Sequence, residues 1–384
     1  MQHLHLIAFD VPAPPNYGGV IDIYYKVRAL YELGIKVHLH CFDYGRGRRD
    51  ELNIICERVY YYPRKSIAFS LPIRYPHIVS SRRNKQLLKT LLQDDYPILF
   101  EGLHTTYYLA YPEFEHRLTM VRMHNVEWEY YYQLAQREGV YKWKQYYLAE
   151  SKQLEHFENI LTYADYVFTI SPKDQAYYQA KFPQSQYLPA FHAHNQISSK
   201  TGQGRYCLYH GKLSVAENHE AALFLINEVF AQLEVPLIIA GSDPQPELIR
   251  LINEHPLVTL RHNLGEGEML DLMRDAHIHV LPTFQSTGIK LKLIHALFTG
   301  RFILVNPHMV HETGLAFSCV LAQSAEEFQQ QINTLMDTPF TEIEKAQRRA
   351  NVLPTFSNQE NARRLAEMIR KGHETKMETR ESTE

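Results

Sequence analysis

The sequence predicts an α/β protein made of two doubly wound, Rossmann-like domains. Apolar runs that are typical of buried strands alternate with helical patterns along both halves of the chain. A polar stretch without periodicity, from Phe191 to Arg205, separates the two halves. Because such alternation is typical of parallel sheets covered by helices, we expect two domains that face each other across a cleft.

Length and composition narrow the class of protein. A chain of 384 residues suggests two or three domains, and a net charge of −3 gives no basic field for nucleic acid. The four cysteines are scattered without a Cys-x-x-Cys pair, which favours reduced thiols. The chain starts directly with a strand pattern, so we expect no signal peptide, and no apolar run is long enough to cross a bilayer. Together these features predict a cytoplasmic protein.

The first half opens with a strand, a loop and a helix. The strand covers His3–Phe9, the helix runs from about Val20 to Glu32, and Gly18 and Gly19 lie directly before it. The first N–H groups of such a helix can face a ligand, although the same glycines also suit a simple tight turn. The loop is not Gly-x-Gly-x-x-Gly, and no acidic residue ends the next strand, which argues against a nicotinamide cofactor.

Polar side chains follow two further strands of this half, Pro97–Gly102 and Leu118–Met123. His104 comes after the first, and His124, Asn125 and Glu127 come after the second. Carboxyl ends of parallel strands are where α/β sheets place ligands, so these groups could hydrogen-bond a sugar or share a proton. A purely structural role for each histidine stays open.

Residues 64–89 are basic and rich in aromatic and apolar side chains. Such a segment could rest on an anionic membrane surface or bind a lipid diphosphate. Most charge runs only face water, so a solvated loop and helix face is the alternative interpretation of this segment.

The second half repeats the pattern. Its strand near Cys207 ends in Gly211 and Lys212, and its next strand ends in Gly241. We expect domains at 1–195 and 196–355, a helix at 356–371 that packs back on the first domain, and a disordered polar tail at 372–384.

A helix near the end of the second half has an unusual first turn. Lys290 and Lys292 lie at its amino end, where the helix dipole disfavours positive charge. A phosphate on the free N–H groups would reverse that cost, and Gly288 would allow close approach. Lys292 and His295 are three residues apart and share a helix face. Two surface lysines and a structural histidine are the alternative.

These residues, in their order and spacing, resemble the GT-B glycosyltransferases, specifically glycosyltransferase family four, over nearly the whole chain. The resemblance implies a retaining transfer of a sugar from a nucleotide sugar to a hydroxyl acceptor. It implies three groups of residues: a catalytic group, a donor-binding group and an acceptor-side group. The catalytic group is His124, Lys212 and Lys290. The donor-binding group is Gly211, Gly241, Thr287, Gly288, Ile289, Lys292 and His295. The acceptor-side group is Gly18, Gly19, His104, Asn125 and Glu127.

The sequence departs from that family at three positions. Thr287 and His295 stand where the family commonly has two glutamates, and Glu217 stands where it has a lysine near the first donor-domain loop. A neutral His295 can still hydrogen-bond a ribose, but a carboxylate's charge-assisted bond is lost. Lys212 and Lys290 would then supply the charge that meets the diphosphate.

The expected partners are a nucleotide sugar and a glycan or lipid-linked acceptor, with no cofactor, and membrane contact through 64–89. No Asp-x-Asp occurs, so no divalent metal is expected, and His277 and His279 suit a sheet core better than zinc. Three alternatives remain: another enzyme of the same architecture such as an epimerase or phosphorylase, a non-catalytic partner subunit, and an oxidoreductase. The missing dinucleotide fingerprint argues against the last.

Overall fold

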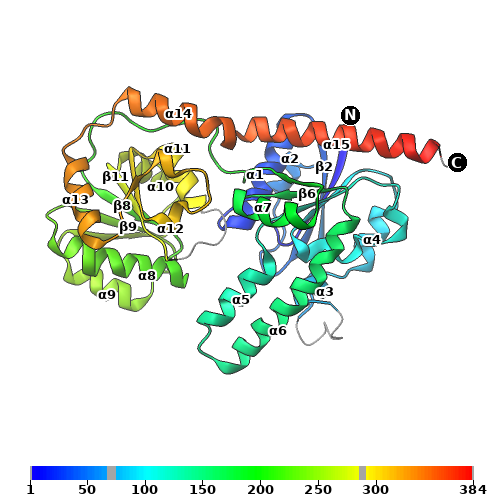
Figure 1. The fold of residues 1–384 in the computed structure, drawn as a ribbon, viewed down its shortest axis with the longest axis horizontal. Coiled ribbons are helices and arrows are strands. Elements are labelled where there is room, and N and C mark those ends of the chain that lie inside the picture. Colours follow the sequence, from blue (N-terminus) through cyan, green and yellow to red (C-terminus); the bar gives the residue numbers. More distant parts are fainter. Residues whose placement is uncertain (1, 67–74, 285–290, 383–384) are drawn as a thin grey trace. The chain divides into compact units, whose positions relative to one another are not determined.

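The computed structural model describes residues 2–66, 75–284 and 291–382 (Figure 1). The chain divides into two compact units. The first unit is Met1–His192 with Asn358–Glu384, and the second is Ala193–Ser357. Each is an α/β unit with a parallel sheet, as the alternation of strands and helices predicts.

The described residues of the first unit form a seven-stranded sheet in the order β3-β2-β1-β4-β5-β6-β7. Its strands are β1 His3–Ala8, β2 Lys36–Asp43, β3 Arg58–Pro63, β4 Ile98–Glu101, β5 Thr119–Met123, β6 Tyr166–Thr169 and β7 Ser185–Tyr187. All neighbours pair in parallel, and β1 lies between β2 and β4, with His5 opposite both His38 and Ile98. The strand order therefore reverses beside β1, which defines the switch point of the sheet.

Helices cover both faces of this sheet. They are α1 Gly18–Glu32, α2 Leu52–Ile55, α3 His77–Ser80, α4 Lys85–Leu91, α5 Glu127–Arg137, α6 Tyr141–Phe157, α7 Pro172–Lys181 and α15 Asn358–Glu381. Short 3₁₀ turns occur at Leu103–Tyr108, Pro112–Phe114 and Glu158–Tyr163. Leu4 and Leu6 of β1 pack in a core with α1 and α15, whereas Ile7 packs in the core of the opposite face. This alternation buries both faces of the strand.

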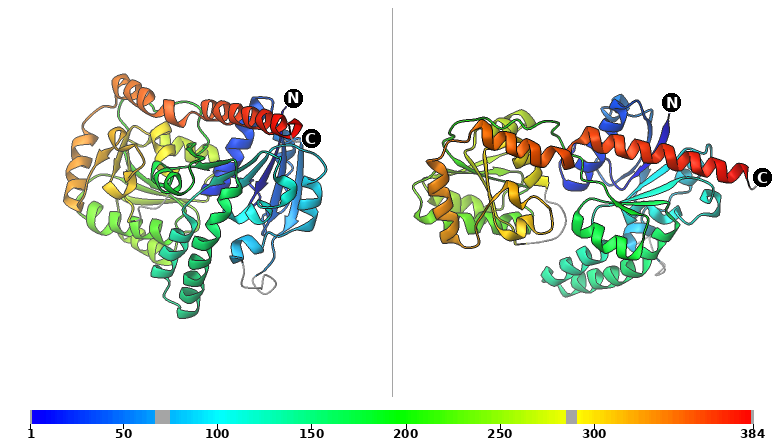
Figure 2. Two further views of the ribbon diagram at one scale, coloured as in Figure 1. Left: turned by 45° about the vertical axis from the view of Figure 1, so that its right-hand side comes forward. Right: turned by 45° about the horizontal axis from the view of Figure 1, so that its top comes forward.

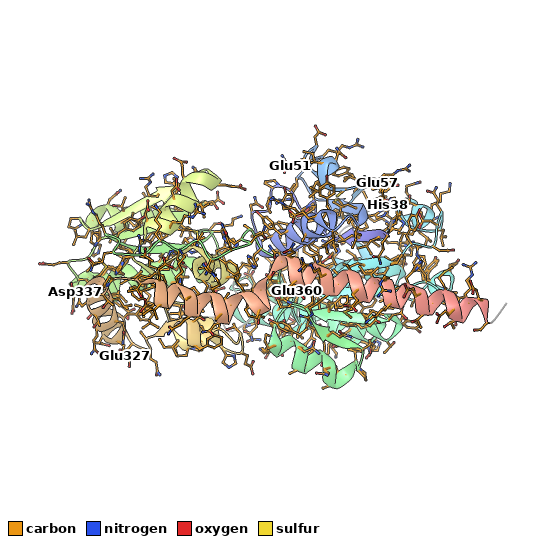
Figure 3. The ribbon with its side chains drawn as sticks, turned by 90° about the horizontal axis from the view of Figure 1, so that it is seen from above. His38, Glu51, Glu57, Glu327, Asp337 and Glu360 are labelled. Atoms are coloured by element: carbon orange, nitrogen blue, oxygen red, sulfur yellow. The ribbon has the colours of Figure 1, made fainter. Side chains whose placement is uncertain are left out.

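The C-terminal segment corrects our expectation of a polar, disordered tail from residue 372. Helix α15 continues through Gly372 to Glu381 and lies along α1 (Figure 3). Gly372 is buried, and a Cβ there would come within 2.8 Å of Leu118. Beyond it, Lys376 pairs with Asp165 at 2.8 Å and Arg380 pairs with Asp95 at 3.0 Å. The polar residues therefore have partners on the first unit, which composition alone does not reveal.

The described residues of the second unit form a six-stranded sheet in the order β10-β9-β8-β11-β12-β13. The strands are β8 Cys207–His210, β9 Leu237–Gly241, β10 Val258–His262, β11 Ile278–Leu281, β12 Phe302–Val305 and β13 Val320–Leu321. The helices are α8 Ala216–Phe224, α9 Pro246–Glu254, α10 Glu266–Asp275, α11 Leu291–Thr299, α12 Pro307–Val310, α13 Ala325–Met336 and α14 Glu342–Phe356. Here β8 lies between β9 and β11, so the switch point is beside β8.

The stretch that separates the two halves is not a free linker. Ile197 is buried in the core of the second unit, Ser198 N donates to Phe298 O at 2.7 Å, and Ser199 Oγ donates to Gly300 O at 2.6 Å. The segment after Ala193 thus lies against the end of α11. The two connections between the units meet at His192 and Asn358, where the Asn358 amide both donates to and accepts from the His192 backbone. Of the described helices, none is both long enough and apolar enough to cross a bilayer.

Candidate functional site

The switch point of the first sheet brings together most of the acceptor-side residues. Gly18 and Gly19 begin the helix that follows β1, His104 follows β4, and His124 follows β5. The Phe9 ring lies 5.1 Å from the His104 ring and 5.2 Å, edge-on, from the His124 ring. Side chains from three neighbouring strand ends therefore meet around Phe9, as the carboxyl ends of parallel strands predict.

Close packing against Phe9 explains the glycine at position 19. A Cβ on Gly19 would approach Phe9 Cζ to 2.4 Å, so only glycine lets this ring lie against the start of α1. Tyr17 precedes the helix without a side-chain cap, and its hydroxyl donates to Asp10 at 2.7 Å. The N–H groups of Gly18 and Gly19 have no acceptor among the described residues. The amino end of α1 is thus available to an electronegative group.

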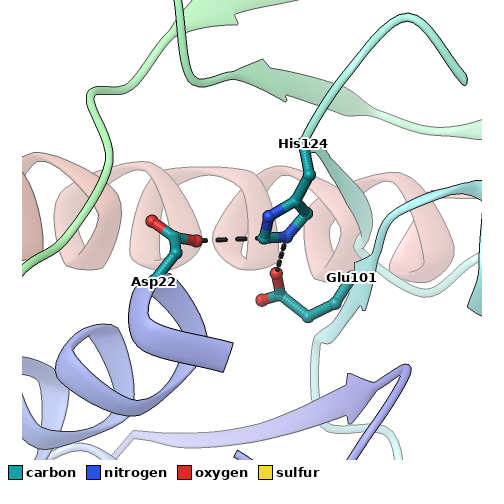
Figure 4. A group of neighbouring side chains, drawn as sticks. All are labelled: Asp22, Glu101 and His124. Carbon is teal, nitrogen blue, oxygen red and sulfur yellow. Dashed lines mark hydrogen bonds and ion pairs between the residues drawn. The ribbon is translucent and has the colours of Figure 1, made fainter. Parts of the chain in front are cut away.

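A buried network of charged side chains lies at this edge, and Figure 4 shows three of its members, Asp22, Glu101 and His124. Arg122 forms a two-bond pair with Asp22, in which both N···O distances are 2.7 Å. Lys26 lies 3.0 Å from Asp22 and 2.7 Å from Glu101. His124 Nε2 lies 2.9 Å from Glu101 Oε2 and 4.0 Å from Asp22 Oδ2. The two carboxylates and two cations balance, which is the condition for burying charge without a large desolvation cost.

The network orients the ring of His124. Burial alone would raise the pKa of Glu101, but Lys26 and His124 hold it below its usual value. Burial would likewise raise the pKa of Asp22, and Arg122 and Lys26 hold it far below. Because Glu101 is an anion, His124 Nε2 donates to it, and in the neutral ring Nδ1 becomes the acceptor. The ring is therefore both oriented and given one tautomer.

The same three side chains offer ligand atoms that lie within 4.8 Å of one another, a spacing that could suit a metal ion. The charges argue against one. Lys26 and Arg122 already neutralise both carboxylates, and an added cation would lie against the Lys26 ammonium. We therefore interpret Asp22, Glu101 and His124 as a positioning network and not as a metal centre.

His104 and Glu127 form a second pair at this edge. His104 Nδ1 lies 3.9 Å from Glu127 Oε1, which is too long for a hydrogen bond, and neither atom has another partner among the described residues. Burial raises the pKa of Glu127 to about 8, so the carboxyl is protonated at neutral pH. Burial, together with the Arg82 cation, lowers the pKa of His104 well below its usual value. Both groups are thus neutral, and two buried polar atoms lack partners, which is unusual in a folded protein.

The backbone supports this pair. Gly102 has a φ of +66°, and a Cβ there would come within 2.8 Å of His104 Nδ1, so glycine is needed for the turn after β4. The carbonyl of Asn125 accepts from the Tyr178 hydroxyl at 3.3 Å, which fixes the loop between His124 and α5.

Arg82 corrects part of the interpretation of the basic segment 64–89. Its guanidinium is buried and donates to Phe9 O at 3.0 Å and to Ile78 O at 2.7 Å. It therefore supports the site from inside and is not part of a surface patch. Residues 67–74 of the segment lie outside the described residues.

The switch point of the second sheet holds the described donor-side residues. Gly211 follows β8 and Gly241 ends β9, and a Cβ on Gly241 would come within 1.8 Å of the Gly211 carbonyl oxygen. This close approach requires glycine at position 241. The Lys212 ammonium is more than half exposed and lies 3.7 Å from Asp243.

Lys292, in the first turn of α11, is held by side chains of β8 and α8. Its ammonium donates to Asn218 Oδ1 at 2.8 Å and to the Tyr209 hydroxyl at 3.4 Å. Asn218 in turn donates to the Lys212 carbonyl at 3.0 Å. The Asn218 amide thus links the Lys292 ammonium to the backbone of Lys212. Thr287, Gly288, Ile289 and Lys290, which were also expected here, lie outside the described residues.

Two of the residues that depart from the family pattern lie at the same edge. His295 is partly buried, and burial lowers its pKa to about 4, so the ring is neutral at pH 7. Its Nε2 has no hydrogen-bond partner among the described residues. Glu217, in the first turn of α8, accepts from the Thr283 hydroxyl. In contrast, His277 and His279 are sheet-core groups that bond backbone carbonyls, at 2.7 Å and 2.8 Å.

Sequence reasoning missed the buried network. Its members are Asp22, Lys26, Glu101 and Arg122, together with the supporting Arg82. A signal was present, because Asp22 and Lys26 are four residues apart within the apolar face of α1, next to Ile23 and Val27. Two opposite charges on the buried stripe of a helix indicate a partnered internal pair.

The sequence matches no family model. It is 24% identical, over 325 residues, to an uncharacterized 44.6 kDa protein in the cps region of Klebsiella pneumoniae, covering 79% of this chain and 82% of that one. The structure superposes on sucrose-phosphate synthase from Thermosynechococcus elongatus with a TM-score of 0.69 and 17% identity, over 97% of this chain and 99% of that chain. The chain has the GT-B fold of glycosyltransferases.

Two further GT-B structures were solved with nucleotides. The catalytic domain of starch synthase IV from Arabidopsis thaliana, bound to ADP and acarbose, has a TM-score of 0.64 at 11% identity, over 97% of this chain and 99% of that one. HepE from Anabaena, in complex with UDP and glucose, has a TM-score of 0.61 at 14% identity, over 96% and 99%. These matches span both GT-B units of the present chain.

Proposed function

We propose that the protein is a hexosyltransferase that moves a sugar from a UDP- or GDP-linked donor to a hydroxyl acceptor, with retention of configuration. The observation that supports this most is the GT-B fold along the whole chain, shared with structures that hold UDP with glucose or ADP with acarbose. The side chains at the two switch points supply the chemistry that such a transfer needs.

On the first unit, the acceptor hydroxyl enters between His104 and Glu127. A hydroxyl oxygen there accepts a hydrogen bond from the protonated Glu127 carboxyl and donates its proton to neutral His104 Nδ1. The 3.9 Å separation of the two atoms fits one bridging oxygen at ordinary hydrogen-bond distances from both. Both atoms then gain the partner that they lack among the described residues. His124, oriented by Glu101, hydrogen-bonds the donor sugar.

On the second unit, the leaving diphosphate develops negative charge as the glycosidic bond breaks. Lys292 and Lys212 stabilise that charge, beside the turns at Gly211 and Gly241 that follow β8 and end β9. Neutral His295 takes the place of a carboxylate and binds the donor ribose as a hydrogen-bonding group. Fixed amides and lysines do this without a divalent metal.

The relative in the Klebsiella pneumoniae cps region supports a role in surface polysaccharide or glycoconjugate assembly, with a glycan or lipid-linked acceptor. We place the protein on the cytoplasmic side of the membrane. Within the segment 64–89, Arg83, Lys85 and Lys89 line a cavity of about 610 Å³ together with Leu92 and Tyr107. A basic groove with an apolar wall suits peripheral contact with an anionic, lipid-linked substrate.

The test is release of nucleoside diphosphate from a panel of UDP-, GDP- and ADP-sugars, with and without a pool of glycan and lipid-linked acceptors. We expect release by one donor, dependent on acceptor. We expect His104→Ala and His124→Ala to lower turnover at least tenfold while the circular dichroism spectrum stays unchanged. Wild-type turnover in both variants would remove the first-unit edge from the reaction.

Two other outcomes identify the alternatives. A new nucleotide sugar formed without acceptor would indicate an epimerase of the same architecture. The replacement of both family glutamates, by Thr287 and His295, favours a non-catalytic partner subunit as the second candidate. That role requires that none of the donors is consumed while the folded protein still binds a glycan or a second transferase.

A further inference from the structure

The first unit carries a helical hairpin that extends away from its sheet. Helices α5 and α6 lie side by side in every view and project beyond the strands (Figures 1 and 2). The turn between them, residues 138–140, forms the tip. The Tyr131 and Tyr147 rings pack edge to face across the hairpin, 6.1 Å apart. The body of the hairpin is therefore held by its own contacts.

The tip exposes large apolar and aromatic side chains. Tyr141 is 76% exposed, Val140 is 56% exposed and Trp143 is 43% exposed. The exposure falls along α6 toward its root, where Glu150 and Leu154 are buried. A solvent-facing helical hairpin does not need these side chains at its end, and burying one such side chain is worth about 1.5–3 kcal/mol. The tip therefore exposes apolar surface whose burial against a partner would be favourable.

Basic side chains alternate with these aromatics. Lys142 and Lys144 flank Trp143, and neither forms an ion pair with a described residue. Lys142 lies over the Trp143 ring at 6.0 Å. At the tip turn, Glu138 accepts a hydrogen bond from Val140 N at 2.9 Å, which defines the turn. The exposed end of the hairpin thus combines aromatic surface with positive charge.

The root of the hairpin is fixed to α3 and α7 of the same unit. Glu150 accepts from Ile78 N at 2.9 Å, Ser151 Oγ donates to Trp128 O at 2.8 Å, and Trp128 Nε1 donates to the Tyr177 hydroxyl at 2.7 Å. Helix α5 also begins at Glu127, so the root lies at the edge where His104 and Glu127 meet. The root is therefore held by hydrogen bonds to its own unit.

We propose that the α5–α6 tip is a membrane anchor that inserts Val140, Tyr141 and Trp143 into the headgroup region of an anionic bilayer. Trp and Tyr concentrate at membrane–water interfaces, where the ring lies among the headgroups and its polar atom stays in water. Lys142 and Lys144 then meet anionic lipid phosphates, each contributing to binding at low ionic strength. The narrow end of a two-helix hairpin is small for a stable protein interface, which buries about 800 Å² per partner, whereas a bilayer accepts a small, convex wedge.

The chain offers a direct reporter, because it has only two tryptophans. Trp128→Phe leaves Trp143 as the sole indole, located at the tip. We expect the emission of this variant to shift to the blue on vesicles of phosphatidylglycerol and phosphatidylcholine, with less shift on phosphatidylcholine alone. Lipids brominated near the glycerol backbone are expected to quench it. An emission spectrum that stays unchanged, while the protein sediments with the vesicles, would overturn the proposal.

Variants of the tip provide a second test, in which the fraction of full-length protein bound to vesicles is measured by sedimentation. The combined Tyr141→Ser and Trp143→Ser variant, and Lys142→Glu with Lys144→Glu, are each expected to lower the bound fraction at half-saturating lipid about tenfold. The matched control is Tyr163→Ser, since Tyr163 is 62% exposed on the same unit but away from the tip. Binding that survives both tip variants but is lost in Lys85→Glu with Lys89→Glu would assign the contact to residues 64–89 and refute the anchor. Binding of the wild type to a second protein and not to vesicles would refute it as well.

Discussion

Glu127→Gln tests the protonated carboxyl at the candidate acceptor site. Burial keeps the proton on Glu127 up to a pKa of about 8, whereas an unfolded glutamate loses it near 4.5. Between these values the folded chain holds a proton that the unfolded chain has released, so stability falls as pH rises from 4.5 to 8. At pH 7 this cost amounts to about 3 kcal/mol, taking about 1.4 kcal/mol for each pH unit above 4.5.

Gln has the same shape and does not titrate, so the substitution removes this cost. We expect the variant to be more stable than the wild type by about 1–3 kcal/mol at pH 7, with little difference near pH 4.5. The assay is urea unfolding at pH 5, 7 and 8, followed by circular dichroism. A gain in stability that is the same at all three values would refute the protonated carboxyl.

Turnover provides the second readout for the same variant. In the wild type, activity that depends on the protonated carboxyl falls as pH rises through about 8. Glu127→Gln is expected to lose this alkaline limb because the amide donates at every pH. A variant that is more stable and yet changed in its pH profile would identify Glu127 as a residue kept for function at the expense of stability.

Three further predictions concern other parts of the chain. Lys292→Ala is expected to weaken binding of UDP or GDP by about 1–3 kcal/mol, or five- to 150-fold in Kd by calorimetry, and an unchanged Kd would exclude this lysine from the site. Asp22→Asn, which leaves its buried cationic partners uncompensated, should lower the free energy of unfolding by about 3–5 kcal/mol, whereas Glu32→Gln, in a half-exposed pair, should cost under about 1 kcal/mol. Similar losses in the two variants would contradict the assigned burial. Finally, burial lowers the pKa of His38 to about 4 and that of His40 well below 6.5, so the stability that these neutral rings contribute is retained above pH 6.5 and lost as pH falls below it. Glu127 acts in the opposite direction over this range, so the test uses Glu127→Gln, in which a thermal midpoint that is flat from pH 7 to 5 would contradict the effect of the histidines.

The alternation of strands and helices in both units could be predicted from the sequence because local patterns decide it. Apolar strands with helices between them fold as parallel sheets, and Gly34, with a φ of +79°, ends α1 as expected of a helix stop. Strand β3 was not predicted. Three consecutive tyrosines, Tyr60 to Tyr62, obscure the alternation that marks a half-buried strand.

Site residues could be predicted only where the place of a residue in the sequence is enough to indicate its role. His104 and His124 follow strand ends, which the sequence displays directly. The partners of Arg122 could not be read in the same way, since Asp22 is 100 residues away and meets it only through the packing of α1 on the sheet. Likewise, the raised pKa of Glu127 depends on burial, and a carboxyl in the first turn of a helix is ordinarily exposed and ionised.

The most direct test of the account is whether the protein binds a nucleoside diphosphate. Thermal unfolding should be recorded with saturating UDP, GDP and ADP and with their sugars, because a ligand of the folded state raises the midpoint by mass action. We predict a rise with one base, shared by the free diphosphate and its sugar and reduced in Lys292→Ala. The same midpoint with all of these ligands would contradict the proposal that this GT-B chain acts on a nucleotide sugar.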